Sequence, residues 1–423
     1  MKDYLIDLIK TRTIKDSFIT ISGTLVNGTL GLIFYFVMAR FLGPTSFGVF
    51  SVAVVTLTLV GDIANFGSDT GTVRFVGKFI NKERKKALKF LKLSLKAKII
   101  SFLFVFLVGW LLTPFLVLQI FGKPELIFPL RLSLIGVGGY LLFGFSTYSL
   151  QAIQRFWVWN GLNISANALR LLIILILIYL GILNAESGLG VYIVIPFLGF
   201  LVGLRFLPKF LSVKNENEVA REFFGYNRWV AAFTVIAAVS GRLDTFLTTS
   251  LLTLKEVGVY QAAVQLASIV PQIVFALGTV VAPKLAGIKK DSQALDYLKK
   301  LQVFVFVLAA LGLLLGIPLS KFVIPILYGA EYIASTTPFI VLLLAQAVFL
   351  ISVPAHTAVF FYFSYPKLFF FIALGHLVII GGLGTYLIGL YGYLGAALAV
   401  LVGNIFNLAI PVTWVILKFK KTK

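Results

Sequence analysis

Cysteine is absent from this 423-residue sequence, and acidic residues are scarce, with 16 aspartates and glutamates against 37 lysines and arginines. Without cysteine the chain has no disulfide and no thiolate metal site, although this does not identify its compartment. Charged residues make up only 13% of the sequence and hydrophobic residues 59%, and the mean hydropathy is +1.00. So few charged groups could not cover the surface of a water-soluble globule. The composition therefore indicates an integral membrane protein.

Long apolar runs provide the membrane spans that such a protein needs. A helix requires about 20 mostly apolar residues to cross a hydrocarbon core of about 30 Å. Twelve segments meet this requirement: 18–38, 47–66, 99–120, 127–150, 161–183, 188–207, 228–251, 257–280, 301–319, 336–358, 368–387 and 393–417. Barrel strands would be about half as long and would alternate in polarity, which these segments do not. The sequence therefore predicts an all-α integral membrane protein with twelve transmembrane helices.

Basic residues are concentrated in alternate loops between these segments. Ten lie between Arg74 and Lys98, against the single acid Glu83, and others cluster in 284–300 and 418–423. The intervening loops are nearly free of basic residues. By the positive-inside rule, both termini are cytoplasmic in a multi-pass protein of the cell (inner or plasma) membrane. The net charge of +21 therefore indicates membrane topology, and we expect no nucleic-acid partner.

An internal repeat divides the chain into two halves. At an offset of 210 residues, Gly48 falls on Gly258 and Ala53 on Ala263. A repeat this long indicates two homologous halves rather than a solenoid. We expect an N-terminal six-helix lobe at 1–208, a cytoplasmic linker at 209–227 and a C-terminal six-helix lobe at 228–423. Because six is even, both lobes enter the membrane in the same direction, related by a pseudo-two-fold axis along the membrane normal, with the substrate path between them.

Polar residues within the spans form stripes on four helices, two from each half. In 257–280, Gln261, Gln265 and Gln272 share one helical face. The repeat makes Asp62, on a polar face of 47–66, equivalent to Gln272. Asn27 lies on a polar face of 18–38, and Arg242 and Thr245 lie on one face of 228–251. Such residues are costly in lipid unless they face protein or water. A shared aqueous cavity is the preferred interpretation, and hydrogen-bonded helix packing is the alternative.

Two arginines lie deep within the spans. In 161–183, Asn163, Asn167 and Arg170 share one face, and Arg170 lies near the membrane midplane. Arg242 lies in 228–251, two residues before Asp244, and residues at that spacing do not face one another on a helix. Pairing with an acid on another helix and contact with an anionic substrate both remain open for these arginines.

Several features expected of an enzyme are missing. No pair of acids stands in a sizeable loop, and the sequence shows no metal-ligand cluster and no nucleotide-binding motif. We therefore expect neither an enzyme nor a cofactor or metal site.

Four segments carry a family resemblance. They are Ala39-Arg-Phe-Leu-Gly-Pro-Thr-Ser-Phe-Gly, Gly241-Arg-Leu-Asp, Val257-Gly-Val-Tyr-Gln-Ala-Ala and Gly392-Tyr-Leu-Gly-Ala-Ala. Through them the chain resembles the Wzx-type polysaccharide flippases of the multidrug, oligosaccharidyl-lipid and polysaccharide exporter superfamily. The resemblance implies the MATE-like fold, with a cavity lined by the first, second, seventh and eighth helices.

The same resemblance implies transfer of a polyprenyl diphosphate-linked oligosaccharide to the outer leaflet by alternating access. Arg170 and Arg242 would then bind the diphosphate. A proton or sodium ion exchanged at Asp62 or Asp244 remains open as the coupling ion. Membrane lipids are expected contacts, and glycan assembly proteins are candidate partners. An ion-coupled multidrug or cation antiporter of the same fold is the alternative, whereas a membrane glycan polymerase would need a large outer loop with catalytic groups.

Overall fold

The computed structural model describes residues 12–214, 217–365 and 367–421, which form helices and turns with no strand among them. Within these ranges, eleven helices are long and apolar enough to cross a membrane. The first of them, Ser22–Asn65, has 44 residues, about twice the number needed for one crossing. It therefore accommodates both predicted spans 18–38 and 47–66, and the all-α membrane prediction is confirmed.

The first described helix, α2 (Arg12–Asn65), is interrupted where the sequence predicts a loop. Gly43 has φ 70° and ψ 168°, which is not helical, and Pro44 follows it. Glycine adopts positive φ without a steric penalty, and proline favours the first turn of a helix because its missing N–H is not needed there. These two residues end one helical arm and begin the next.

The described chain divides into two compact units. Unit 1 comprises the described residues up to Phe41 together with Val49–Ala238, and unit 2 comprises Leu42–Gly48 together with the described residues from Val239 onward. The segment 42–48 of α2 thus packs with the later part of the chain. The lobe boundaries expected from the sequence, at 208 and 228, stay a prediction.

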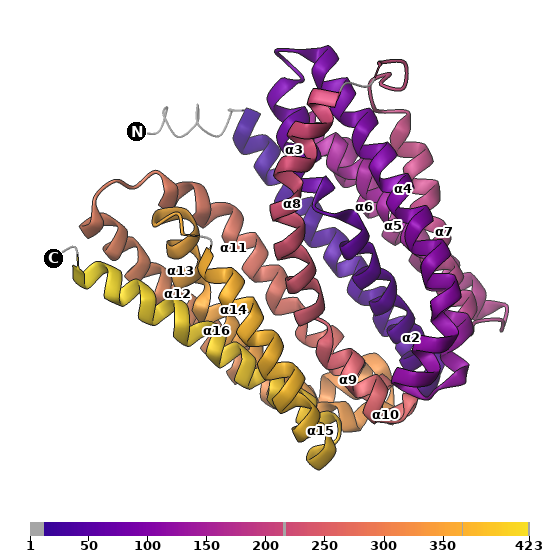
Figure 1. Ribbon diagram of the computed structural model, residues 1–423. Helices are drawn as coiled ribbons and strands as arrows, with labels where there is room; N and C mark the ends of the chain where they lie inside the picture. The colour runs from indigo at the N-terminus through magenta and orange to yellow at the C-terminus, as the bar shows by residue number, and fades with distance from the viewer. Residues whose placement is uncertain (1–11, 215–216, 366, 422–423) are drawn as a thin grey trace. The chain divides into compact units, whose positions relative to one another are not determined.

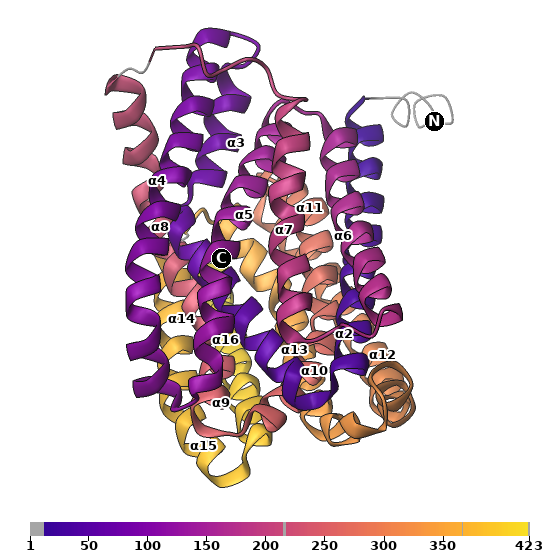
Figure 2. The ribbon, with the colours of Figure 1, turned by 90° about the vertical axis from the view of Figure 1, so that its right-hand side faces the viewer.

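Unit 1 is built around the central helix α5. Its helices are most of α2, α3 (Ser68–Phe79), α4 (Arg84–Leu116), α5 (Ile127–Ala152), α6 (Phe156–Tyr179), α7 (Ala185–Leu204) and α8 (Asn217–Ser240), with the short turns η1 (Val117–Phe121) and η2 (Pro124–Leu126) between α4 and α5. Helix α5 packs against α3, α4, α6 and α7 (Figure 1 and Figure 2). Small residues on α5 allow this, because a Cβ on Gly139 would lie 3.0 Å from the Ile193 carbonyl oxygen of α7.

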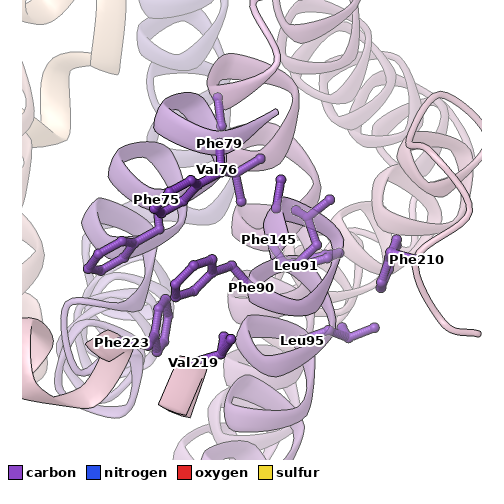
Figure 3. Packing of buried hydrophobic residues seen from close by; sticks show 12 residues of the cluster. Phe75, Val76, Phe79, Phe90, Leu91, Leu95, Phe145, Phe210, Val219 and Phe223 are labelled. Atoms are coloured by element: carbon purple, nitrogen blue, oxygen red, sulfur yellow. The ribbon is translucent and has the colours of Figure 1, made fainter. Parts of the chain in front are cut away.

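Aromatic side chains fill one end of unit 1. The rings of Phe75 on α3 and Phe90 on α4 stack with centroids 4.7 Å apart and an interplanar angle of 9°. Phe223 and Val219 of α8 pack against them (Figure 3). Burial of large aromatic surfaces is a strong stabilising contribution, so this cluster holds the start of α8 against α3 and α4.

Unit 2 contains the remaining helices. They are α9 (Leu243–Leu251), α10 (Leu254–Ala267), α11 (Ile269–Ala286), α12 (Asp291–Tyr328), α13 (Thr336–Thr357), α14 (Lys367–Val378), α15 (Gly384–Tyr391) and α16 (Tyr393–Lys421), with the short turns η3 (Ala330–Ser335), η4 (Ala358–Tyr362) and η5 (Ile379–Leu383). Helix α13 packs against α10, α11, α12 and α16.

Two predicted spans are divided in the structure. The segment 228–251 is split between α8 and α9, because Gly241 and Arg242 form a turn and Arg242 has φ −131° and ψ 1°. The segment 257–280 is split after Ala267 into α10 and α11. Pro271 has no N–H to donate to the Ala267 carbonyl, so a continuous helix would lose this hydrogen bond. Hydrophobicity identified both spans but not these breaks.

Candidate functional site

A polar cavity lies inside unit 1, among α2, α5, α6 and α7. Its volume is about 220 Å³. The lining residues are Asn27, Leu57, Gly136, Tyr140, Phe143, Asn163, Ala166, Asn167, Arg170, Tyr192 and Pro196. Four residues that the sequence singled out, Asn27, Asn163, Asn167 and Arg170, are therefore brought together. One of the lining residues is a cation and none is a carboxylate, so the cavity suits an anionic or hydroxyl-rich group.

Arg170 is positioned from two sides. One guanidinium nitrogen, Nη1, donates to Asn167 Oδ1 at 3.1 Å, and the guanidinium carbon lies 4.3 Å from the centroid of the Tyr192 ring. Its Nε is buried and has no hydrogen-bond partner. Stacking on an aromatic ring holds an arginine in place without neutralising its charge. The arrangement therefore leaves Arg170 with a positive charge and an unused donor.

The amides around Arg170 form a short hydrogen-bonded chain between α6 and α2. Asn167 Nδ2 donates to Asn27 Oδ1 at 2.7 Å, while Asn163 Nδ2 donates to the Trp159 carbonyl oxygen within α6 at 2.8 Å. One turn earlier, the buried Asn160 donates to the Ile19 carbonyl oxygen of α2 at 2.7 Å. These bonds fix the polar face of α6 against the polar face of α2.

Asp62 lies beside this cavity and is bonded to one of its walls. The hydroxyl of Tyr140, a lining residue on α5, donates to Asp62 Oδ1 at 2.5 Å. Asp62 itself is half-buried on α2. The tyrosine thus links the carboxylate to the polar cavity, a connection that sequence spacing did not reveal.

Two of the predicted site residues of unit 2, Asp244 and Gln261, have hydrogen-bond partners within that unit. The Tyr260 hydroxyl donates to Oδ2 of the buried Asp244 at 2.6 Å, and Gln261, which is 1% exposed, donates from Nε2 to Thr245 Oγ1 at 2.8 Å. Both bonds join α9 to α10. These hydrogen bonds between α9 and α10 explain how the polar side chains of Asp244 and Gln261 are accommodated at buried positions.

Arg242, Gln265 and Gln272 are half-buried. Arg242 stands at the N-cap position of α9 rather than inside a helix. The rule that residues two apart do not face one another on a helix therefore does not apply to Arg242 and Asp244, which is a correction to the sequence argument. Gln265 lies at the end of α10 and Gln272 in α11, so the helix break after Ala267 separates them.

Lys98 was missed as a site residue, because it directly precedes an apolar run and the sequence assigned it to a basic loop. The structure places it within α4, 1% exposed. Its Nζ lies 2.7 Å from Asp69 Oδ1 and donates to Asn65 Oδ1 at 2.8 Å. Tyr192 and Tyr140 were also missed, since an aromatic residue in an apolar span gives no sequence signal of a polar role.

Residues 12–214, 217–365 and 367–421 contain no group of three or more histidines, cysteines or acids that could hold a metal ion. The polar groups of the predicted site residues and their partners described above are amides, hydroxyls, arginines, a lysine and carboxylates. Such groups can bind and orient a polar solute, and they can exchange a proton or a monovalent ion.

Solved membrane transporters share this fold. An inward-facing multidrug resistance transporter of the MATE family, within the MOP superfamily, superposes with a TM-score of 0.75 at 13% identity, over 96% of this chain and 98% of its own. The lipid II flippase MurJ, in an inward closed conformation, superposes with a TM-score of 0.76 at 17% identity, over 96% of this chain and 89% of its own. A MOP superfamily transporter from Pyrococcus furiosus superposes with a TM-score of 0.68 at 13% identity, over 96% of this chain and 95% of its own. The protein is thus a multi-pass membrane protein with the MATE-like fold.

A family model described as polysaccharide biosynthesis protein matches residues 13–289, more than half of the chain. The chain belongs to this family, which confirms the resemblance to polysaccharide flippases found in its sequence. Among curated proteins, none matches the chain in sequence.

Proposed function

We propose that the protein moves a polyprenyl diphosphate-linked oligosaccharide from the cytoplasmic to the outer leaflet of the cell membrane by alternating access. The family and the fold support a transporter that serves polysaccharide assembly. The observation that carries the proposal is Arg170, a half-buried cation with an unused donor in a polar cavity that has no carboxylate among its lining residues.

The cavity chemistry matches the head group of such a lipid. Guanidinium groups bind phosphate oxygens through paired hydrogen bonds, and Arg170 keeps Nε available for one of them. Asn27, Asn163 and Asn167 offer amide donors and acceptors to sugar hydroxyls. Tyr192 and Tyr140 present aromatic faces with polar tips. In this proposal, the lipid tail remains in the bilayer while the head group crosses.

The membrane potential is sufficient as an energy source. Moving one charge across 100 mV is worth about 2.3 kcal/mol, so export of a diphosphate with about two charges from an inside-negative cell gains about 4 to 5 kcal/mol. Exchange of a proton or sodium ion would add to this. Asp62 is the better placed of the two acids, because Tyr140 joins it to the cavity, whereas Asp244 is buried against Tyr260. Glycan assembly proteins would supply and receive the substrate.

Replacing the two arginines tests the assignment. We expect Arg170→Ala and Arg242→Ala each to abolish complementation of a flippase-null strain, because the diphosphate would lose its cationic partner. Arg170→Lys should restore only part of the activity, since lysine keeps the charge but not the planar fork. Arg221→Ala removes an exposed arginine of α8 and serves as the matched control. Normal glycan export by the membrane-inserted Arg170→Ala and Arg242→Ala variants would contradict the proposal.

An ion-coupled exporter of cationic drugs is the second candidate. It is favoured by the fold shared with a multidrug resistance transporter and by the carboxylate of Asp62 bonded to a cavity wall. A deletion strain separates the two functions. Accumulation of lipid-linked glycan without a change in dye export supports flipping, and lost export of cationic dyes with normal glycan supports the antiporter.

A further inference from the structure

A second cavity of unit 1 lies among α2, α3, α4 and α8, and the proposed transport site does not use it. Its volume is about 260 Å³. The polar groups that line it include Asn65 of α2, Lys98 of α4 and the consecutive pair Asn227 and Arg228 of α8. The aromatic cluster around Phe223 holds α8 in place beside it (Figure 3).

Asn227 indicates that this cavity receives a ligand. Its side chain is 3% exposed, and neither Oδ1 nor Nδ2 has a hydrogen-bond partner. The amide packs against Gly71 of α3, where an added Cβ would lie 2.3 Å from Oδ1. A buried amide without partners is unfavourable unless a bound group supplies the missing hydrogen bonds. Asn227 offers such a group both a donor and an acceptor.

Lys98 contributes a further donor. Its ammonium group can donate three hydrogen bonds. One is directed to Asn65 Oδ1, and Asp69 Oδ1 lies 2.7 Å away on another side. A third donor is therefore left for a group inside the cavity. Arg228 is a second cation among the lining residues.

The cavity lies where the sequences of two helices change from charged to apolar residues, as expected of a site at the lipid head-group level. Lys98 is the last cation before the uncharged run 99–122 of α4 and the following turn, and Arg228 is the last charged residue before the run 229–240 that completes α8. The polar-to-apolar boundaries of two helices therefore meet at the same cavity. Phe66 and Phe224, at its border, are 55% and 50% exposed and offer apolar surface for lipid chains.

We propose that this cavity binds the phosphodiester head group of an anionic membrane lipid that carries a hydroxyl beside its phosphate, as phosphatidylglycerol does. Lys98 and Asn227 Nδ2 donate to phosphate oxygens, and the lipid hydroxyl donates to Asn227 Oδ1. A phosphodiester provides acceptor oxygens for these donors and a negative charge that the cations lining the cavity attract. The lipid is a bound component of unit 1 and does not depend on which substrate the transporter carries.

Thermal unfolding of the purified full-length protein in detergent tests this site. Short-chain phosphatidylglycerol should raise the unfolding temperature in a saturable manner. Asn227→Leu should weaken the apparent affinity by about tenfold, because phosphate and hydroxyl both lose their amide partner. Asn217→Leu, at an exposed position of the same helix, is the matched control and should bind like the parent protein.

Three results would overturn the proposal. They are equal stabilisation by short-chain phosphatidylcholine, equal stabilisation by inorganic phosphate alone, and unchanged phosphatidylglycerol affinity in Asn227→Leu. If that variant does not fold, Ala97→Leu decides the question, because it fills the cavity from α4 without removing a polar group. Lost binding in Ala97→Leu supports the site, and retained binding contradicts it.

Discussion

The buried charge of Lys98 is compensated by a specific partner, Asp69. Lys98 is 1% exposed, and its partner Asp69 is 14% exposed. Removing one member of a buried ion pair leaves the other without compensation, which is usually more costly than losing both. The ion pair therefore predicts a non-additive response to substitution.

We expect Lys98→Met to lower the free energy of unfolding by about 3 kcal/mol, since the half-buried Asp69 would lose its cation. Adding Asp69→Asn should recover most of this loss, because the double variant contains no unpaired buried charge. Lys96→Met removes an exposed lysine from the same helix and should change stability little. Thermal unfolding in lipid-free detergent measures all three. Equal losses in Lys98→Met and the double variant would show that the ion pair is not the cause.

The sequence singled out polar residues within the spans, but it could not predict which side chains contact them. Spacing placed Asn163, Asn167 and Arg170 on one face of a helix, and the structure places all three around one cavity. The spacing of residues in the sequence gave no indication that Tyr192 stacks on Arg170 or that Tyr140 donates a hydrogen bond to Asp62. These contacts join residues far apart in the chain, so they depend on how the helices pack.

Two glycines that the repeat makes equivalent allow two helical segments of unit 2 to pack closely. Gly48 and Gly258 contact one another, and a Cβ on either would lie 3.1 Å from the backbone nitrogen of the other. A Cβ on Gly258 would also lie 1.8 Å from the Pro44 carbonyl oxygen, and a Cβ on Gly48 would lie 2.1 Å from that of Leu254. The backbone of α2 thus approaches α10 more closely than any side chain would allow.

We expect Gly258→Ala to destabilise the protein by about 1 to 3 kcal/mol, because the added methyl group forces the two backbones apart. Gly312→Ala is the control. That glycine lies in α12 with no atom within 4 Å of an added Cβ, so alanine should be neutral or slightly stabilising through its helix propensity. Unfolding temperatures of the two variants provide the comparison. A Gly258→Ala protein as stable as Gly312→Ala would contradict the close approach.

Hydrophobic length predicted the spans but not their interruptions. Helix α2 contains two predicted spans because Gly43 and Pro44 redirect it without a long loop. The turn at Gly241 and Arg242 contains no proline, the strongest helix-breaking residue, and the sequence did not predict it. The apolar composition of a segment indicates whether it can span the membrane, whereas a break within the segment depends on the local backbone conformation.

The whole molecule has a charge distribution that predicts its orientation in the membrane. Lys85, in the first turn of α4, and Lys289 belong to the basic segments between spans. Glu186 and Lys255, in the first turns of α7 and α10, belong to the segments with few charges, and all four residues are exposed. The basic loops should face the cytoplasm. Because the chain contains no cysteine, a single introduced cysteine reports its own position without background.

We expect Lys85→Cys and Lys289→Cys to react with a membrane-impermeant maleimide only after the membrane is permeabilised. Glu186→Cys and Lys255→Cys should react in intact cells. Labelling of permeabilised cells controls for the reactivity of each site. Labelling of Lys85→Cys in intact cells, with protection of Lys255→Cys, would show the opposite orientation.

By itself the sequence determined the class of protein, because the high apolar content, the span lengths and the repeat follow directly from residue type and spacing. Only the tertiary structure decided which polar groups have partners. It placed Arg170 in a cavity, directed Gln261 toward Thr245 and buried Lys98 against Asp69. The reason is physical: membrane insertion depends on summed hydrophobicity along each segment, whereas a binding site depends on distances of a few ångströms between side chains from different helices.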